Sequence, residues 1–332
     1  MRCPTLSELP PPPAGLTGWP WTEGSTVLPA EGPDGREWPL VSVVTPSFNQ
    51  ARYLEATLRS ILLQGYPRLE LFVMDGGSTD GSFEIIKKYA SWIREWVSEP
   101  DGGQSSAINR GLRLSSGAFF TWINSDDMLY QNALTSHALG FGFEDGVVYV
   151  GDCLYIDEHD RPLYAHRGKV HTFEELVSVR NVWRAPLRGH IVQPEVIFPR
   201  QLAVDVGGLD AHNHRTMDYQ LWGKFFLAGA TFRYTHVPFA RFRIHGEQKT
   251  GQGWATTRSL VATAVKLVRA ADSLAESRRE ELIADLLAYE RDYWRETGVL
   301  ARLGLPEQIV LPLRDLQAGV RRRAGTLLRR AS

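Results

Sequence analysis

From Leu40 to about residue 130, short β-branched apolar runs alternate with amphipathic stretches. The pattern predicts strands at Val41–Thr45, Leu69–Met74, Trp96–Ser98 and Phe119–Ile123, and helices near Arg52–Leu63, Phe83–Tyr89 and Ser105–Leu114. The first of these helices carries an apolar stripe at three- and four-residue spacing, formed by Leu54, Leu58, Ile61 and Leu62. Such a stripe covers one face of a sheet. Strands alternating with helices predict an α/β fold with helices packed on a parallel sheet.

Beyond Tyr130 the alternation becomes looser. We expect a strand at Val147–Val150, a mixed segment to Phe198, a helix near Tyr219–Leu227 and a strand leading to His245. Residues from about Trp254 to Glu296 have a helical pattern, with Leu260, Ala264, Leu267 and Ala271 on one stripe. We therefore expect one α/β domain over residues 39–250 and a helical C-terminal extension over 251–332.

Residues 1–38 are rich in proline and glycine and carry Trp19, Trp21 and Trp38. This composition predicts an extended N-terminal arm without regular secondary structure. A fully solvated linker seldom carries so much aromatic surface, so we expect the arm to pack on the domain. The alternative is a segment that docks a partner.

Composition limits the classes of partner. The 332 residues are 43% hydrophobic, enough for a large core, and the formal net charge of −1 gives no overall field to attract nucleic acid. Cys3 and Cys153 show no metal-ligand spacing and no disulfide framework. The chain has no apolar signal region after Met1 and no run of eighteen uncharged apolar residues. We expect a cytoplasmic protein whose membrane contact, if any, is peripheral.

Polar residues follow each of the first four predicted strands. This placement matters because open parallel sheets bind ligands beyond the carboxyl ends of their strands. The four segments are Thr45-Pro46-Ser47-Phe48-Asn49, Asp75-Gly76-Gly77-Ser78-Thr79-Asp80, Glu99-Pro100-Asp101-Gly102-Gly103-Gln104 and Asn124-Ser125-Asp126-Asp127.

In their order along the chain, these segments resemble the motifs of inverting family 2 glycosyltransferases, especially a bacterial subgroup similar to surface-polysaccharide enzymes. The resemblance runs from about Leu40 to Thr250. It is carried by VSVVTPSFNQ, VMDGGSTDGS, EPDGGQSSAINRG, WINSDD, GGLD and MDYQLW. It implies a GT-A type fold, a mixed and mostly parallel sheet flanked by helices. Residues 39–130 would form the nucleotide-sugar-binding half and residues 131–250 the acceptor half.

The resemblance implies that Asp75 hydrogen-bonds the nucleobase, with Pro46, Ser47 and Asn49 beside it. A carboxylate accepts from a base imide N–H, and the glycines that follow Asp75 allow a close backbone approach. The alternative is a plain turn, in which the polar residues after Asp75 cap the next helix. We expect residues 78–80 to do that capping.

Asp101 and Gln104 flank two glycines before a predicted helix start, where free backbone amides can meet a phosphate or a ribose. Many members of the resembled family carry an arginine where this chain has Ile108. The departure leaves phosphate neutralisation to a metal and other residues. We expect Asn109 to brace the loop.

The Asn124-Ser125-Asp126-Asp127 segment stands where the resembled family has its Asp-x-Asp metal motif, so the resemblance also places Asn124 and Ser125 at the donor. Mn²⁺ and Mg²⁺ are commonly held by one or two carboxylates plus substrate phosphates, so an asparagine in the first position need not abolish binding. Asp126 is the expected principal ligand. Asp127 either joins it or hydrogen-bonds the backbone.

Two basic side chains near the end of the matched region extend this site by resemblance. His245 is a second candidate metal ligand, although a lone histidine is more often structural. Lys249 is expected to close over the phosphates.

Asp218 opens the helix of the MDYQLW motif, where the resembled family has its catalytic carboxylate. The resemblance makes Asp218 the general base. The alternative is an N-terminal cap or a partner of the helix dipole.

Together these residues predict a metal-dependent inverting transferase that moves a sugar from a nucleoside diphosphate, most often UDP in the resembled family, onto a glycan or lipid-linked acceptor. The departures at Asn124 and Ile108 motivate an alternative, a non-catalytic nucleotide-sugar- or carbohydrate-binding protein. A nucleotidyltransferase is disfavoured, since no Gly-rich basic loop lies near the N-terminus. Residues 313–330 form a basic amphipathic pattern that either lies on the inner face of an anionic membrane or packs on the protein.

Overall fold

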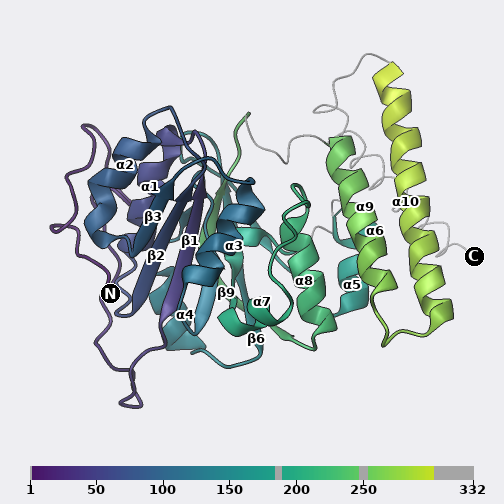
Figure 1. Cartoon of the computed structure of the whole chain (residues 1–332), viewed down its shortest axis with the longest axis horizontal. Coiled ribbons are helices and arrows are strands. Elements are labelled where there is room, and N and C mark those ends of the chain that lie inside the picture. Colours follow the sequence, from purple (N-terminus) through teal and green to yellow (C-terminus); the bar gives the residue numbers. More distant parts are fainter. Residues whose placement is uncertain (1, 184–188, 247–252, 303–332) are drawn as a thin grey trace, which may run out of the picture. The chain divides into compact units, whose positions relative to one another are not determined.

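The computed structural model describes residues 2–183, 189–246 and 253–302 (Figure 1). Lys249 and the basic segment at 313–330 lie outside these residues. The chain divides into two compact units, Met1–Gly168 with Ile191–Gln248, and Lys169–His190 with Lys249–Ser332.

The first unit begins with the alternating elements that the apolar pattern predicts, and each predicted boundary falls within two residues of the observed one. They are β1 (Val41–Ser47), α1 (Ala51–Leu62), β2 (Leu69–Asp75), α2 (Ser82–Tyr89), β3 (Glu95–Ser98), α3 (Gln104–Leu114) and β4 (Phe119–Trp122). The later elements are β5 (Met128–Leu129), α4 (Ala133–Gly140), β6 (Val147–Ile156), β7 (Pro162–Arg167), β8 (Val196–Pro199), α7 (Arg200–Asp205), α8 (Met217–Leu227) and β9 (Thr231–Arg243).

These strands form one mixed sheet, which confirms the predicted fold class. Over the described residues the strand order is β3-β2-β1-β4-β8-β6-β9-β5, with β7 paired to β6. The strands β1, β2, β3 and β4 run parallel, and the register sets Asp75 beside both Ser47 and Ser98. The carboxyl ends of these strands therefore meet at one edge, where the predicted site residues lie.

Helix α3 approaches the sheet closely at a glycine. A Cβ atom at Gly111 would lie only 2.4 Å from Val44 Cγ2 in β1, so a larger residue there would push the helix outward. This close packing fixes the distance between α3 and the strands β1 and β2 on which it packs (Figure 1). It thereby sets where Gln104, at the first turn of α3, meets the sheet edge.

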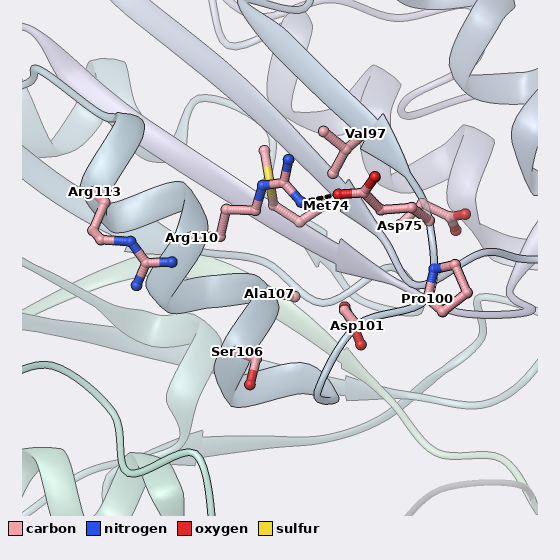
Figure 2. A pocket seen from close by; sticks show the side chains of 10 residues that line it. Met74, Asp75, Val97, Pro100, Asp101, Ser106, Ala107, Arg110 and Arg113 are labelled. Atoms are coloured by element: carbon pink, nitrogen blue, oxygen red, sulfur yellow. Dashed lines mark hydrogen bonds and ion pairs between the residues drawn. The ribbon is translucent and has the colours of Figure 1, made fainter.

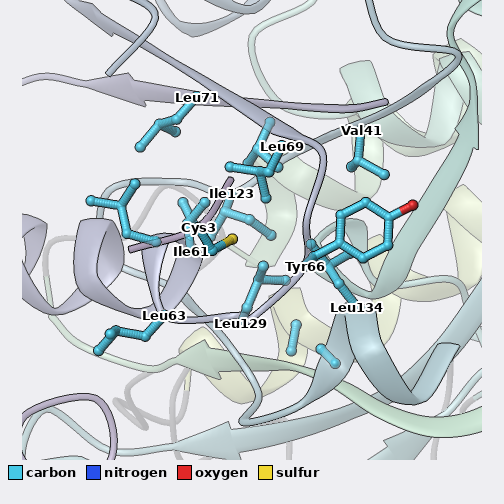
Figure 3. Packing of buried hydrophobic residues seen from close by; sticks show 14 of the residues in the cluster. Cys3, Val41, Ile61, Leu63, Tyr66, Leu69, Leu71, Ile123, Leu129 and Leu134 are labelled. Carbon is cyan, nitrogen blue, oxygen red and sulfur yellow. The ribbon is translucent and has the colours of Figure 1, made fainter. Parts of the chain in front are cut away.

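The N-terminal arm packs into the main hydrophobic core. Cys3 lies among the side chains of Ile61 and Tyr66 (Figure 3), and Trp19 belongs to the same buried cluster. The Trp19 indole N–H donates to the Leu129 carbonyl at 3.0 Å. The arm is therefore part of the first unit's core, whereas its tryptophan content predicted packing on the domain surface.

Arg59 of α1 holds the N-terminal arm in place through hydrogen bonds. Its side chain is fully buried, and the guanidinium donates to the carbonyl oxygens of Pro10, Pro20 and Trp21 at 2.8, 3.0 and 2.9 Å. Buried charges require such compensation because water no longer solvates them. The arm's own backbone supplies it.

The region after Tyr130 holds the elements that the looser pattern did not resolve. Strand β6 runs to Ile156, well past the predicted end at Val150, and β8 inserts antiparallel between β4 and β6. Because β8 is only four residues long and fully buried, its apolar run carries no alternation that would mark it as a strand.

The second unit is helical. It contains α5 (Phe173–Val177), α6 (Val179–Val182), α9 (Gly253–Arg269) and α10 (Glu276–Arg302). The predicted stripe is buried, but its last residue, Ala271, lies beyond the end of α9. Residues 270–275 separate α9 from α10 where one helical stretch was predicted. Arg180 pairs with Asp292 at 2.6 Å and joins α6 to α10. None of the helices in the described part of the chain has the length and apolar character needed to cross a membrane.

Candidate functional site

Asp75 ends β2 as a buried carboxylate that organises the following turn. Its Oδ2 accepts from the backbone N–H groups of Gly77 and Ser78 and from Ser98 Oγ, at 3.2, 2.9 and 2.7 Å. Its Oδ1 accepts from Ser78 Oγ at 2.5 Å. Oδ2 is fully used by the protein, whereas Oδ1 carries a single bond. The turn-forming role proposed as an alternative is present, and it leaves one oxygen with capacity for a further donor.

The ends of β1 and β2 are fastened to each other by side chains. Asn49 has a left-handed backbone with φ of 52°, its N–H donates to Ser78 Oγ at 2.7 Å, and its Oδ1 accepts from Thr79 N–H at 2.9 Å. Asp80 accepts from the backbone N–H of Ala51 at the start of α1. Of residues 78–80, which were expected to cap the next helix, only Asp80 bonds to the start of α2, where it accepts from Ser82. Ser78 and Thr79 bond to Asn49 instead.

The first polar segment contributes two further site candidates from β1. Pro46 is buried and pairs with Met74 of β2. The backbone carbonyl of Ser47 accepts from Gly76 N–H at 2.8 Å. Ser47 Oγ is buried and has no hydrogen-bond partner within the described residues.

A cavity of about 180 Å³ opens beside Asp75 (Figure 2). Asp101 lines it from the loop before α3, and its carboxylate accepts from Gly103 N–H at 2.7 Å. Arg110 and Arg113 line it from α3, and Arg110 forms an ion pair with Glu99. Sequence reasoning missed these arginines. Their three-residue spacing on the helix that begins at the glycine loop was the available signal.

Ile108, which stands where many members of the resembled family carry an arginine, is buried and does not line this cavity. Its neighbour Asn109 instead braces the loop before α8. Asn109 Nδ2 donates to the Leu209 carbonyl at 2.7 Å, and its Oδ1 accepts from Leu209 N–H at 2.9 Å.

The Asn124–Asp127 segment places Asp126 against His245. Asp126 Oδ2 lies 3.0 Å from His245 Nε2, and the imidazole is 3% exposed while the carboxylate is 18% exposed. The Tyr53 ring packs against the imidazole at a centroid distance of 5.1 Å. Arg243 Nε donates to the Asp126 carbonyl at 2.8 Å. The two candidate metal ligands, 119 residues apart, thus meet at one point.

Asp127 points inward. Its Oδ1 accepts from Arg243 N–H at 2.9 Å, and its Oδ2 accepts from Asn124 Nδ2 at 3.2 Å. Burial, and to a smaller extent the neighbouring Asp126 charge, raise the pKa of Asp127 well above its usual value. Of the two roles left open for Asp127, its contacts match backbone hydrogen bonding.

Ser125 is also turned into the protein, where its backbone carbonyl accepts from Thr57 Oγ1 at 2.9 Å. Asn124 meets three side chains. Its Oδ1 accepts from Gln104 Nε2 at 2.7 Å, and its Nδ2 donates to Gln193 Oε1 at 3.2 Å as well as to Asp127. Gln193, in a one-turn helix before β8, is a site residue that the sequence did not reveal.

The donor set determines which metal would fit. The structure's described residues contain no group of three or more His, Cys, Asp or Glu side chains arranged for a metal. Asp126 and His245 therefore offer one carboxylate oxygen and one imidazole nitrogen. The carboxylate oxygen suits Mg²⁺ or Mn²⁺, which leave most of their positions to substrate phosphates and water, and the imidazole nitrogen suits a transition metal such as Mn²⁺ better than Mg²⁺.

Asp218 lies in the first turn of α8, partly buried, and its Oδ1 accepts from Tyr219 N–H at 2.8 Å. Burial raises the pKa of Asp218 to about 6. Ser105 Oγ lies 2.8 Å from Met217 Sδ, so the start of α3 contacts the start of α8. Gln104, next to Ser105, reaches Asn124. One turn of α3 therefore links the metal-motif segment to the helix that carries Asp218.

A family comparison decides the relationship that the motifs suggested. Residues 42–199 match the profile of Glycosyl transferase family 2, and they include the ends of β1, β2 and β4. Residues 42–199 are a glycosyl transferase family 2 domain. Asp218 and His245 lie beyond the matched residues, so family membership alone does not assign their roles.

Several relatives of the chain are bacterial. It is 30% identical to an uncharacterized glycosyltransferase of Rickettsia prowazekii over 217 residues, which cover 64% of this chain and 66% of the relative. It is 32% identical to glycosyltransferase GlyG of Streptococcus pneumoniae over 41% of this chain and 47% of GlyG. The match spans just under two thirds of the first relative and about a third of three other rickettsial proteins.

Among solved structures, Staphylococcus aureus TarS has the same fold. The fragment of residues 1–349, solved in complex with UDP-GlcNAc, aligns with a TM-score of 0.54 and 19% identity over 75% of this chain and 71% of the fragment. This likeness concerns the fold alone.

Proposed function

We propose that this protein transfers a sugar from a nucleoside diphosphate, with UDP as the first candidate, to an acceptor hydroxyl with inversion at the anomeric carbon. The observation that carries this assignment is the Asp126–His245 pair at the sheet edge, 3.0 Å apart and tied through Asn124 and Gln104 to the start of α3. Family membership supports transferase chemistry over a non-catalytic binding role.

The donor nucleotide is assigned to the edge formed by β1, β2 and α3. Asp75 Oδ1 has capacity for one more donor, which suits a base imide N–H, and Ser47 Oγ is a buried hydroxyl without a protein partner among the described residues. The backbone amides at the start of α3 favour an anion. TarS, a protein of the same fold, is solved with UDP-GlcNAc, which makes UDP-sugars the natural first probes.

Asp126 and His245 would hold a divalent cation, Mn²⁺ or Mg²⁺, beside the donor phosphates. When bound, such a cation neutralises charge on the diphosphate leaving group. Lys249 is proposed to add a second positive charge over the phosphates.

Asp218 is proposed as the general base. A carboxylate with its pKa raised to about 6 is still deprotonated at neutral pH and is a stronger base than an ordinary aspartate. It removes the proton of the acceptor hydroxyl as that oxygen attacks the anomeric carbon from the face opposite the diphosphate. The configuration at that carbon therefore inverts.

The acceptor is proposed to be a glycan or a lipid-linked glycan of a surface polysaccharide. Support comes from the name of a Bacillus subtilis relative, the putative teichuronic acid biosynthesis glycosyltransferase TuaG, which is 38% identical over 93 residues. These residues cover 27% of this chain and 36% of TuaG.

Donor and metal binding can be tested together by thermal unfolding. Purified protein is heated with UDP-, GDP- and dTDP-sugars, with and without Mn²⁺, because a ligand that binds only the folded state raises the melting temperature. We expect a Mn²⁺-dependent rise of several degrees for one nucleotide class, and its loss in Asp126→Ala. The exposed Asp145→Ala variant should keep the full shift.

Two results would count against the assignment. No shift with any nucleotide sugar would argue for a different substrate class. An undiminished shift in Asp126→Ala would remove Asp126 from the metal site.

A further inference from the structure

The first residue of the metal motif is held in a side-chain amide network formed by Gln104, Asn124 and Gln193. Gln193 Nε2 donates to the Trp122 carbonyl at 2.6 Å, and its Oε1 accepts from Asn124 Nδ2 at 3.2 Å. Asn124 Oδ1 in turn accepts from Gln104 Nε2 at 2.7 Å. The network runs from the segment before β8, past the end of β4, to the first turn of α3.

Asn124 uses both ends of its amide. Its Nδ2 carries two hydrogens and donates to two acceptors, Gln193 Oε1 and Asp127 Oδ2, while its Oδ1 takes the Gln104 donor. A carboxylate at this position offers acceptors only. An aspartate would therefore face Gln193 Oε1, an acceptor that carries no proton, and the hydrogen bond between them would be lost. It would also set a second carboxyl against that of Asp127.

Gln193 cannot relieve that conflict by turning its amide around. Its Nε2 is committed to the Trp122 carbonyl, and the turned amide would bring Oε1 against that carbonyl instead. Gln193 is only 6% exposed, so water does not readily replace the lost bond. Gln193 consequently fixes which end of the Asn124 amide faces Asp127.

We propose that Asn124 is a positioning residue that, oriented by Gln193, holds Gln104 and the start of α3 against the metal-motif segment, and that it is not a weakened metal ligand. This inference rests on the proposed donor site. It assigns the cation contact within the segment to Asp126, while Asn124 and Asp127 brace the loop. It also predicts that restoring the acidic residue expected in an Asp-x-Asp motif weakens the site.

The test compares Asn124→Asp, Asp127→Asn and the exchanged double variant Asn124→Asp with Asp127→Asn. The double variant restores a donor opposite an acceptor between the two positions. Asn181→Asp, an exposed asparagine of α6, controls for the added charge. Each protein is measured for ligand-free melting temperature and for affinity toward UDP in the presence of Mn²⁺ by calorimetry.

We expect Asn124→Asp to melt about 3–6 °C lower than the wild type and to bind UDP with Mn²⁺ roughly 10-fold more weakly. The exchanged double variant should melt higher and bind UDP with Mn²⁺ more tightly than the summed effects of the two single variants predict. Such non-additivity is the signature of a direct interaction. Asn181→Asp should match the wild type.

Tighter binding or a lower Mn²⁺ requirement in Asn124→Asp would overturn the inference and make position 124 a metal ligand. An exchanged variant that is merely additive would also overturn it. If the wild type binds no nucleotide, the proposed function fails, but the melting temperatures of the same four variants still decide whether the network exists.

Discussion

Asp218 combines the geometry of a helix N-terminus with a pKa raised to about 6, and this value makes a directional prediction. A general base must be deprotonated, so turnover should be full above pH 7 and fall about tenfold for each pH unit below about 6. Asp218→Asn should lower turnover by roughly 10²–10⁴-fold while leaving donor affinity within about twofold. Steady-state kinetics across pH 5–9 and calorimetry with the donor measure both quantities.

A stability measurement separates this effect from misfolding. Because the folded-state pKa lies above the ordinary aspartate value of 3.8, the Asp218 carboxyl adds stability at low pH and loses it as the pH rises through about 6. The neutral asparagine should therefore melt no lower than the wild type at pH 8. Asp205→Asn, exposed on α7, is the charge-matched control. Parallel losses of turnover and donor affinity would remove Asp218 from the role of base.

Residue identities predicted the candidate site only where a motif carried them. Asp75, Asp126 and Asp218 stand in short motifs whose chemistry can be recognised from the neighbouring residues in the sequence. Only the three-dimensional structure shows that Gln193 and Arg110 lie at the site. Gln193 lies in the one-turn helix before β8, 71 residues after the Trp122 carbonyl that it contacts. Arg110 is an ordinary helix arginine in the sequence, and only the structure shows that it lines the cavity beside Asp75.

At the scale of elements, α1 and the N-terminal arm depend on one buried side chain. Arg59→Met keeps much of the side-chain volume but leaves the Pro10, Pro20 and Trp21 carbonyls without their donor. Unsatisfied buried acceptors are costly, so we expect a loss of roughly 2–4 kcal/mol in the free energy of unfolding, measured by urea denaturation. Arg52→Met, on an exposed part of the same helix, should cost less than about 1 kcal/mol.

Equal losses in the two variants would mean that the carbonyl contacts to Arg59 contribute nothing specific. The sequence could not reveal these contacts between Arg59 and the arm. An arginine among the apolar positions of an amphipathic helix is expected to reach solvent, and its burial follows only from an arm that lies outside the predicted elements. Elements with strong local periodicity were predictable, whereas β8 and the break between α9 and α10 depend on tertiary packing.

For the whole molecule, the question is whether the arm folds with the sheet or merely covers it. Trp19 is 8% exposed, shares a cluster with core residues of β1 and α1, and donates to Leu129. If the arm belongs to one cooperative unit, Trp19→Ala should lower the free energy of unfolding by roughly 3–5 kcal/mol, the cost of emptying a large buried site. Circular dichroism during urea denaturation should show one transition with an unchanged slope.

Leu16→Ala is the matched control, because Leu16 lies in the same arm but is 41% exposed. It should change stability by less than about 0.5 kcal/mol. An arm that merely covers the sheet would instead detach first, so Trp19→Ala would leave the main transition unchanged and add an early, separate phase. A single shifted transition would show that residues 2–38 unfold together with β1 and α1. Loss of the arm would then disturb the donor site through these two elements.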